Sequence, residues 1–379
     1  MDFELGEEQV MLKTAARDFL EEECPKTLVR EMMFEDDKGY SPELWKKMAE
    51  QGWMGLAFPE EYGGAGMSFL DLAVLLEEMG RALVPGAFIP TVVLTGRAIL
   101  SAGTEEQKKE FLPKIANGDL VLTLALQEES GSLEASGINV EAYQSDDNFV
   151  IEGTKLFVPD ANVADYFLCA ARTKDSSNQE DGVTLFLVDA KAAGTHTEVL
   201  KTMTGEKQCE VTFRHVSVPK ASILGELDKG WPIIERVMIE AAVAESAWMA
   251  GGARWVLETS TEYAKERVQF GQPIGSFQAI QHKLVNMAME VEGMQPLTYY
   301  AAWAVSENEP DFSLAASMAK AWCSDTYKHV AGDGIQTHGG IGFTWDHDLH
   351  LYFKRAKAAE IAFGDAEHHR EKIAGMLNL

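Results

Sequence analysis

The sequence predicts an α+β protein of three parts: a helical N-terminal domain, a middle antiparallel β-barrel or sandwich, and a C-terminal four-helix bundle. A chain of 379 residues is long enough for two or three domains. Apolar residues recur at helical spacing toward both ends, whereas short apolar runs separated by turn residues fill the middle. These strands do not alternate with helices, which disfavours a Rossmann fold. We place the domains at residues 1–118, 119–228 and 229–379.

The N-terminal part shows recurrent helix signals. Apolar residues from Val10 to Phe19 recur at helical spacing. Ser41-Pro42 and Thr104 are helix starts, because Ser and Thr cap orphan backbone N–H groups and Pro suits the first turn. We expect a further helix over Leu70–Met79 that Gly80 closes, and Pro113 to disturb or end the helix after Thr104.

The middle part consists of short strand-like runs that turn clusters such as 145–148 separate. We expect strands in the five runs 149–151, 156–158, 166–168, 184–188 and 211–213. Long helical segments return after Gly230, and they fall at Trp231–Ala264, Ser276–Val305, Pro310–Ala331 and from Leu349 to the last residue. This change of texture is the basis of the predicted C-terminal bundle.

Composition excludes several classes of protein. Lys and Arg number 33 against 60 Asp and Glu, a formal net charge of −27, which argues against nucleic acid and anionic membranes as partners. No apolar run is long enough for a membrane span. The four cysteines are scattered and no metal-ligand spacing occurs, so we predict neither a disulfide framework nor a metal site. The acidic start Met1–Glu4 is unlike an export signal, and we expect a cytoplasmic protein.

Four motifs occur in a fixed order along the chain. The first is PEEYGGAG at 59–66, before a helix that ends in EEMG. The second runs from Gln107 through Leu112-Pro113 to Gly118, the third is RVQFGQPIGSFQAIQH at 267–282, and the fourth is QTHGGIGFT at 336–344. The third motif is specific in itself. Together with the α–β–α layout, the four motifs resemble the acyl-CoA dehydrogenase superfamily along essentially the whole chain.

The resemblance implies an FAD-dependent oxidoreductase that desaturates acyl-CoA thioesters between Cα and Cβ. In the family a glutamate removes the α-proton while a hydride leaves the β-carbon for flavin N5, and a flavin hydroxyl and a backbone N–H hold the thioester oxygen. The resemblance further implies an electron-transferring flavoprotein as acceptor, and either a homotetramer or an α2β2 assembly with a homologous subunit. The flavin of the family lies between subunits.

Residues of the third and fourth motifs suit the ADP half of FAD. The Arg267 guanidinium is able to form bidentate, charge-assisted hydrogen bonds with a pyrophosphate, and Phe270 offers a flat apolar surface. Gln278 and Gln336 offer amide hydrogen bonds. Gly339 and Gly340 let backbone N–H groups approach the ligand closely. We therefore expect these six residues to bind the cofactor.

The usual catalytic base is missing. Aligning Ala356-Lys357 with the family places Phe363 at the base position, and the alternative position on the first bundle helix falls at Ala241. Glu245 follows four residues later on the same helix face, and its apolar surroundings would raise its pKa toward neutrality, so we prefer it as the base. Glu240 is a second candidate. The backbone N–H of Phe363 still suits the thioester oxygen.

The flavin-ring side also departs from the family pattern. Gln127 opens the segment QEESGSLE, in which the family's cofactor-binding serine aligns with Leu133. Phe157 stands in the segment that meets the ring, and the family's threonine there aligns with Pro159, which offers neither a hydroxyl nor an N–H. Asp365, which aligns with another threonine, is also a predicted cofactor contact and a less favoured candidate for the base.

Three interpretations therefore stay open. The first is an acyl-CoA dehydrogenase that uses Glu245. The second is a different elimination on the same scaffold, such as 1,4-dehydrogenation or desulfination. The third is a non-catalytic partner subunit that lends its ADP-half motifs to a glutamate-bearing homologue.

Overall fold

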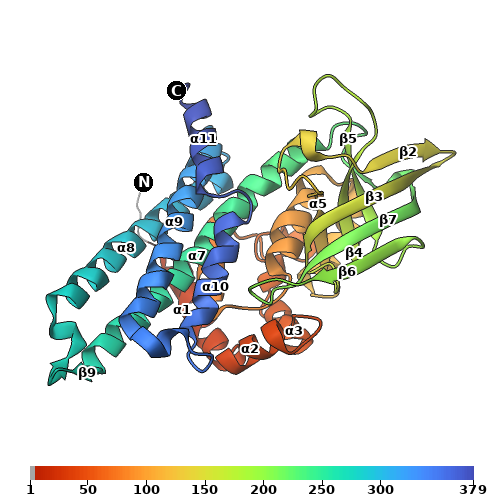
Figure 1. Cartoon of the computed structure of the whole chain (residues 1–379). Helices are drawn as coiled ribbons and strands as arrows, with labels where there is room; N and C mark the ends of the chain where they lie inside the picture. The colour runs from red at the N-terminus through yellow and green to blue at the C-terminus, as the bar shows by residue number, and fades with distance from the viewer. Residues whose placement is uncertain (1–4) are drawn as a thin grey trace. The chain divides into compact units, whose positions relative to one another are not determined.

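The computed structural model describes residues 5–379, so the N-terminal Met1–Glu4, on which the expectation about export signals depended, lie outside it. The chain divides into two compact units. One contains the described residues up to Val29, Ser68–Val84 and Ala242–Leu379, and the other contains Arg30–Met67 and Pro85–Ala241. Figure 1 shows the chain with many of its helices and strands labelled.

The first unit is helical. Its helices are α1 (Glu7–Glu23), α4 (Phe69–Ala82), α8 (Gln278–Glu307), α9 (Phe312–His338), α10 (Leu349–Ile361) and α11 (Ala366–Met376), together with most of α7 (Trp231–Glu266). Helix α9 contacts α8, α10 and α11, and α4 contacts α1 and α8. Figure 1 shows α8 and α9 side by side as a long pair. The predicted C-terminal bundle is confirmed.

The second unit contains a sheet and short helices. The helices are α3 (Pro42–Glu50), α5 (Arg97–Ala102) and α6 (Glu105–Ala116), with a π-helical segment at Ile89–Gly96, and α2 (Lys26–Phe34) joins it to the first unit. The strands are β1 (Leu122–Ala125), β2 (Glu141–Ser145), β3 (Asn148–Pro159), β4 (Tyr166–Arg172), β5 (Val183–Asp189), β6 (Thr195–Leu200), β7 (Gln208–Pro219) and β8 (Ile223–Leu224).

The sheet has eight strands in the order β6-β7-β3-β2-β4-β5-β8, with β1 beside β4. Most neighbours are antiparallel, as predicted, but β1 and β2 each pair with β4 in parallel, which places Leu122 beside Tyr166 and Glu141 beside Arg172. The runs predicted as separate strands at 149–151 and 156–158 belong to one strand, β3, whose register against β7 shifts at two bulges. Buried apolar side chains of one sheet face, Phe167 and Phe213 among them, form the core of this unit.

Ser41 and Thr104 cap their helices as predicted, and each accepts a hydrogen bond from a backbone N–H three residues later. Gly80, however, does not end α4, which continues to Ala82. A Cβ at Gly80 would lie 2.0 Å from the carbonyl oxygen of Trp248, so this glycine serves the close approach of α4 to α7. Pro113 does not end α6 either, because the buried Phe111 and Ile115 anchor the helix on both sides of it.

The predicted helix from Leu349 onward is also broken, into α10 and α11. Phe363 and Gly364 have φ values of 58° and 96°, which no α-helix accommodates. The Asp365 carboxylate then accepts a 2.8 Å hydrogen bond from the N–H of His368 and caps α11.

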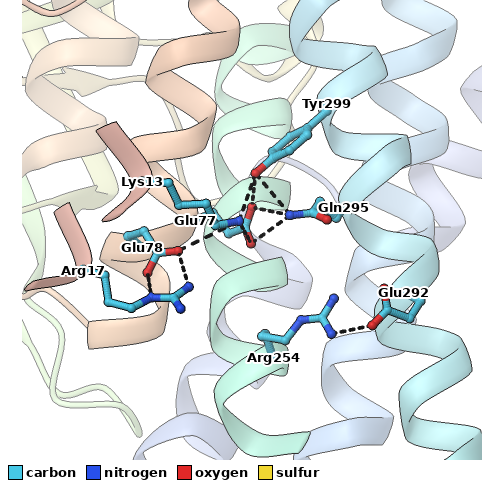
Figure 2. A network of polar contacts seen from close by, with 8 residues as sticks. All are labelled: Lys13, Arg17, Glu77, Glu78, Arg254, Glu292, Gln295 and Tyr299. Carbon is cyan, nitrogen blue, oxygen red and sulfur yellow. Dashed lines mark hydrogen bonds and ion pairs between the residues drawn. The ribbon is translucent and has the colours of Figure 1, made fainter. Parts of the chain in front are cut away.

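A buried polar network ties α1, α4 and α8 together (Figure 2). The Glu77 carboxylate accepts a 2.5 Å hydrogen bond from the hydroxyl of Tyr299 and pairs with the Lys13 ammonium at 2.8 Å. Its neighbour Glu78 binds the Arg17 guanidinium with both oxygens, at 2.9 and 2.8 Å. Glu77 and Glu78 are 5% and 2% exposed, and these hydrogen bonds and ion pairs offset the free-energy cost of burying their charges.

Within residues 5–379, no helix is long and apolar enough to cross a membrane.

Candidate active site

A two-stranded hairpin presents the predicted Arg267 and Phe270. It is formed by β9 (Val268–Gln269) and β10 (Gln272–Pro273), and its two turn residues, Phe270 and Gly271, have φ values of 52° and 83°. That geometry is typical of a tight hairpin turn, and it leaves the Phe270 side chain 93% exposed. Arg267 is exposed at the end of α7, and within the described chain its guanidinium has no hydrogen bond or ion pair.

The remaining predicted residues of the ADP half stand at helix ends of the same unit. Gln278 opens α8, and Gln336 lies in the last turn of α9. Both are exposed, and among residues 5–379 neither side-chain amide has a hydrogen-bond partner. Gly339 has a φ of 63°, and no atom lies within 4 Å of a Cβ built at Gly339 or at Gly340. The N–H of Gly339 donates to the carbonyls of Ile335 and Gln336, and the space beside both glycines is open to a ligand.

The loop that carries Gln127 and Leu133 is anchored by two residues that the sequence analysis missed. The fully buried Lys155 ammonium pairs with the Glu128 carboxylate at 2.6 Å, and Glu128 also accepts hydrogen bonds from the N–H groups of Asn139 and Val140. The sequence signal that could have revealed this pair is a lysine in the middle of a strand-forming run, because a buried ammonium requires a counter-charge. Leu133 is half-buried in this loop.

Phe157 and Pro159 lie at the end of β3, beside its second bulge. Phe157 has a φ of 54° and is 45% exposed, so the bulge turns an aromatic ring outward from the sheet. The Pro159 carbonyl accepts a 2.7 Å hydrogen bond from the Thr123 hydroxyl, which fixes the strand end without any N–H from the proline.

Glu245 is a buried carboxylate on α7. Glu245 is 9% exposed, and its carboxylate has no hydrogen-bond or ion-pair partner among the described residues. Burial raises its pKa to about 7, against the opposing effect of the Lys320 ammonium on α9. A carboxylate in this state accepts a proton near neutral pH.

Glu240 is in a different state. Both of its oxygens are engaged: Arg97 contacts them through two nitrogens, and the Arg236 Nε lies 2.7 Å from Oε1. Glu240 is 2% exposed and serves as the shared counter-ion of the two guanidinium groups. A carboxylate held in this way is a poor proton acceptor, because protonation would remove the negative charge that both guanidinium groups contact.

Phe363 lies in the turn between α10 and α11. Its carbonyl accepts a 3.0 Å hydrogen bond from Nε2 of His369, whereas its N–H has no acceptor within the described chain. Asp365 is exposed and its carboxylate is used as the cap of α11. The turn therefore offers an open backbone N–H from Phe363.

The predicted residues thus fall into two groups. The helical unit carries Glu245, Phe363, Asp365 and the six residues expected at the ADP half, and the sheet-containing unit carries Gln127, Leu133, Phe157, Pro159 and Glu240. The sequence analysis did not single out Lys320, which acts on Glu245, or the Glu128–Lys155 pair, which anchors the loop of Gln127 and Leu133.

Comparison with known proteins gives the same order of three domains along the chain. Models of the acyl-CoA dehydrogenase N-terminal, middle and C-terminal domains match residues 6–119, 123–216 and 228–377. The chain is 33% identical to the probable acyl-CoA dehydrogenase YngJ of Bacillus subtilis, over 100% of both chains.

Solved structures agree. A chain solved in a study of the electron transferring flavoprotein of Acidaminococcus fermentans has 31% identity and a TM-score of 0.93, with coverage of 100% of this chain and 99% of that one. A chain of the ChsE4–ChsE5 complex from Mycobacterium tuberculosis has 28% identity, a TM-score of 0.90 and coverage of 100% and 99%. With matches to all three domain models and full-length relatives of this similarity, the chain belongs to the acyl-CoA dehydrogenase family.

Proposed function

We propose that Glu245 is the catalytic base of this FAD-dependent acyl-CoA dehydrogenase and removes the proton from the carbon next to the thioester carbonyl. The observation that carries the proposal is the state of this one carboxylate. It is buried, it has no hydrogen-bond partner within residues 5–379, and its pKa is raised to about 7. Glu240, the other candidate on α7, is committed to Arg97 and Arg236.

The backbone N–H of Phe363 is proposed to donate to the thioester oxygen. Negative charge that develops on this oxygen acidifies the α-carbon, and a backbone donor fixed in advance stabilises that charge without reorganisation. The role needs no side chain, so the loss of a glutamate at this position does not remove it. The unpaired N–H of Phe363 supports the assignment.

The residues of the helical unit fit FAD. Arg267, Gln278 and Gln336 are exposed donors with no partner in the described chain, and the open space beside Gly339 and Gly340 suits a pyrophosphate. Phe270 adds an exposed aromatic face. Bound FAD supplies the acceptor for the hydride of the β-carbon. We also propose that the cofactor contacts Gln127, Leu133, Phe157, Pro159 and Asp365.

The finer organisation of the protein is also a proposal. We propose domain boundaries at residues 118 and 228, an electron-transferring flavoprotein as acceptor, a cytoplasmic location, and a homotetramer or an α2β2 assembly. Similarity to a chain from a study of an electron transferring flavoprotein supports the acceptor, and similarity to a chain of the ChsE4–ChsE5 complex supports the assembly.

A non-catalytic partner subunit is the second candidate. Pro159 and Leu133 favour it, because neither supplies the hydrogen-bond donor that the family uses at the flavin ring. Measuring flavin absorbance per chain together with native mass, on the chain expressed alone, distinguishes the two. About one flavin per chain in a homo-oligomer supports the dehydrogenase. A flavin-free chain would overturn it and direct attention to a second, glutamate-bearing subunit.

A further inference from the structure

Lys320 is a fully buried lysine in the middle of α9, with a relative exposure of 0%. Its ammonium group donates to the hydroxyl of Ser324 at 2.9 Å and to three backbone carbonyls. These carbonyls belong to Ala359 at 3.1 Å, Glu360 at 3.2 Å and Gly364 at 2.8 Å. Lys320 therefore connects α9 to the end of α10 and to the turn that follows it.

The position of these carbonyls explains why a lysine is buried here. Ala359 and Glu360 lie in the last turn of α10, where carbonyl groups have no partner within the helix. A compact ammonium with three donors satisfies several of them at once, and its charge favours the negative end of the helix dipole. Lys320 thus acts as the C-terminal cap of α10, supplied by a neighbouring helix.

The same contacts orient the backbone of the turn at Phe363 and Gly364. Phe363 and Gly364 both have a positive φ, which is unfavourable for Phe363. The Gly364 carbonyl is held by Lys320 and the Phe363 carbonyl by His369. With both carbonyls held inside the unit, the Phe363 N–H is left without an acceptor within the described chain.

Lys320 also acts electrostatically on Glu245. Burial lowers the pKa of Lys320 to about 8, and Glu245, Cys323, Asp365 and Glu360 oppose that shift in decreasing order. In return, the Lys320 charge lowers the pKa of Glu245, which burial holds at about 7.

Two further titratable groups take part in this cluster. His369 on α11 has its pKa lowered to about 3 by burial and by the Lys320 charge, so it is neutral near pH 7. Tyr327 on α9 has its pKa raised by burial and by Glu245, so it stays protonated. Among the groups that act on this pair in the described chain, Lys320 and Glu245 are therefore the two that titrate near neutral pH.

We infer that Lys320 is a positioning residue of this site: its hydrogen bonds to the carbonyls of Ala359, Glu360 and Gly364 fix the turn that presents the Phe363 N–H. The inference rests on the proposed roles of Glu245 and Phe363. Lys320 touches neither substrate nor cofactor in this account and acts only through these two groups.

The test compares Lys320→Met with Lys328→Met in the flavin-loaded protein. Lys328 is a matched control, because it lies two turns further along α9 and also contacts α10, through an ion pair of 2.5 Å with the side chain of Glu360. The measurements are the pH dependence of kcat/KM, the separate values of kcat and KM for an acyl-CoA thioester, and amide hydrogen exchange over residues 362–368.

Lys320→Met should move the acid limb of kcat/KM upward by about one pH unit, because Glu245 loses the charge that favours its ionised form. It should also raise KM and speed exchange in the turn, whereas Lys328→Met should match the wild type in all three. A Lys320→Met protein with the wild-type acid limb and KM would overturn the inference.

Two further variants, Lys320→Arg and Glu245→Gln, complete the test. If Lys320→Met does not fold, Lys320→Arg keeps the charge but not the compact geometry, so it should keep the wild-type acid limb and raise KM. A wild-type KM in Lys320→Arg would then contradict the positioning role. Glu245→Gln separates this inference from the proposed function: a fully active Glu245→Gln overturns the proposed function, whereas an inactive Glu245→Gln beside an unaffected Lys320→Met overturns only the inference.

Discussion

The positive charge of Lys320 lowers the pKa of the Glu245 carboxyl, yet burial outweighs it and the pKa stands at about 7. The two groups lie on α7 and α9 of the helical unit. Burial alone would favour a neutral acid, and a direct ion pair would favour a permanently charged carboxylate. The balance of these two effects leaves Glu245 able to take up and release a proton near neutral pH.

This balance predicts a pH dependence of stability. The folded-state pKa of Glu245 is raised from 4.5 to about 7, so the folded protein binds this proton more tightly than the unfolded chain does. The stabilisation is complete below pH 4.5 and is lost as the pH rises through 7. Between about pH 5 and pH 7.5, the free energy of unfolding of the wild type should fall by about 2–3 kcal/mol relative to Glu245→Gln.

Urea unfolding of both proteins at several pH values measures this difference, because all other titrating groups are shared. Parallel stability curves for wild type and Glu245→Gln would mean that the Glu245 pKa is not raised.

Glu240→Gln should destabilise the protein without removing its activity. The variant leaves the guanidinium groups of Arg97 and Arg236 without their buried counter-charge, at a cost of about 2–4 kcal/mol. Glu226→Gln is the control, because the Glu226–Lys229 pair is exposed and such pairs contribute little. Urea unfolding gives the cost, and turnover per folded protein below about one tenth of wild type would show that Glu240 takes part in the reaction.

Arg267→Ala should weaken the retention of FAD by about tenfold or more, because the cofactor phosphate loses its charge-assisted hydrogen bonds from the guanidinium group. The exposed Lys265 lies two residues earlier and pairs with Glu262 at 2.6 Å, so Lys265→Ala serves as the control for a change of surface charge. Flavin absorbance per chain after gel filtration measures the effect. Wild-type flavin content in Arg267→Ala would refute the assignment.

Tyr299→Phe should cost about 1–3 kcal/mol of stability, because the buried Glu77 carboxylate loses the 2.5 Å hydrogen bond from the tyrosine hydroxyl (Figure 2). The next residue provides the control: the Tyr300 hydroxyl donates to Asp311 at the surface, so Tyr300→Phe should change stability by less than about 0.5 kcal/mol. Equal effects of the two variants on the urea midpoint would show that the network in Figure 2 contributes little.

Local signals in the sequence predicted most elements of the fold. Ser41 and Thr104 cap their helices because capping depends on residues three positions away. Gly80 and Pro113 misled the prediction because tertiary packing decides their roles: Gly80 admits the backbone at Trp248, and buried neighbours keep α6 intact around Pro113. The parallel pairing of β1 with β4 joins segments far apart in the chain and leaves no local signal.

The candidate site was predictable to a similar degree. Glu245 emerged from its spacing to Ala241 and its apolar surroundings, both of which are visible in the sequence. The commitment of Glu240 to Arg97 was not, since Arg97 lies 143 positions away. Lys320 was missed for the same reason, because the carbonyls it holds follow it by about forty residues and have no side-chain signature.

The most direct test of the account is the reduction of bound flavin by an acyl-CoA thioester under anaerobic conditions, followed by absorbance in wild type and Glu245→Gln. The exposed Glu262 lies on the same helix, so Glu262→Gln is the matched control. We predict that wild type and Glu262→Gln bleach on mixing, and that Glu245→Gln binds flavin normally but bleaches at least about a thousandfold more slowly. Bleaching of Glu245→Gln at the wild-type rate would contradict the central claim that Glu245 is the base.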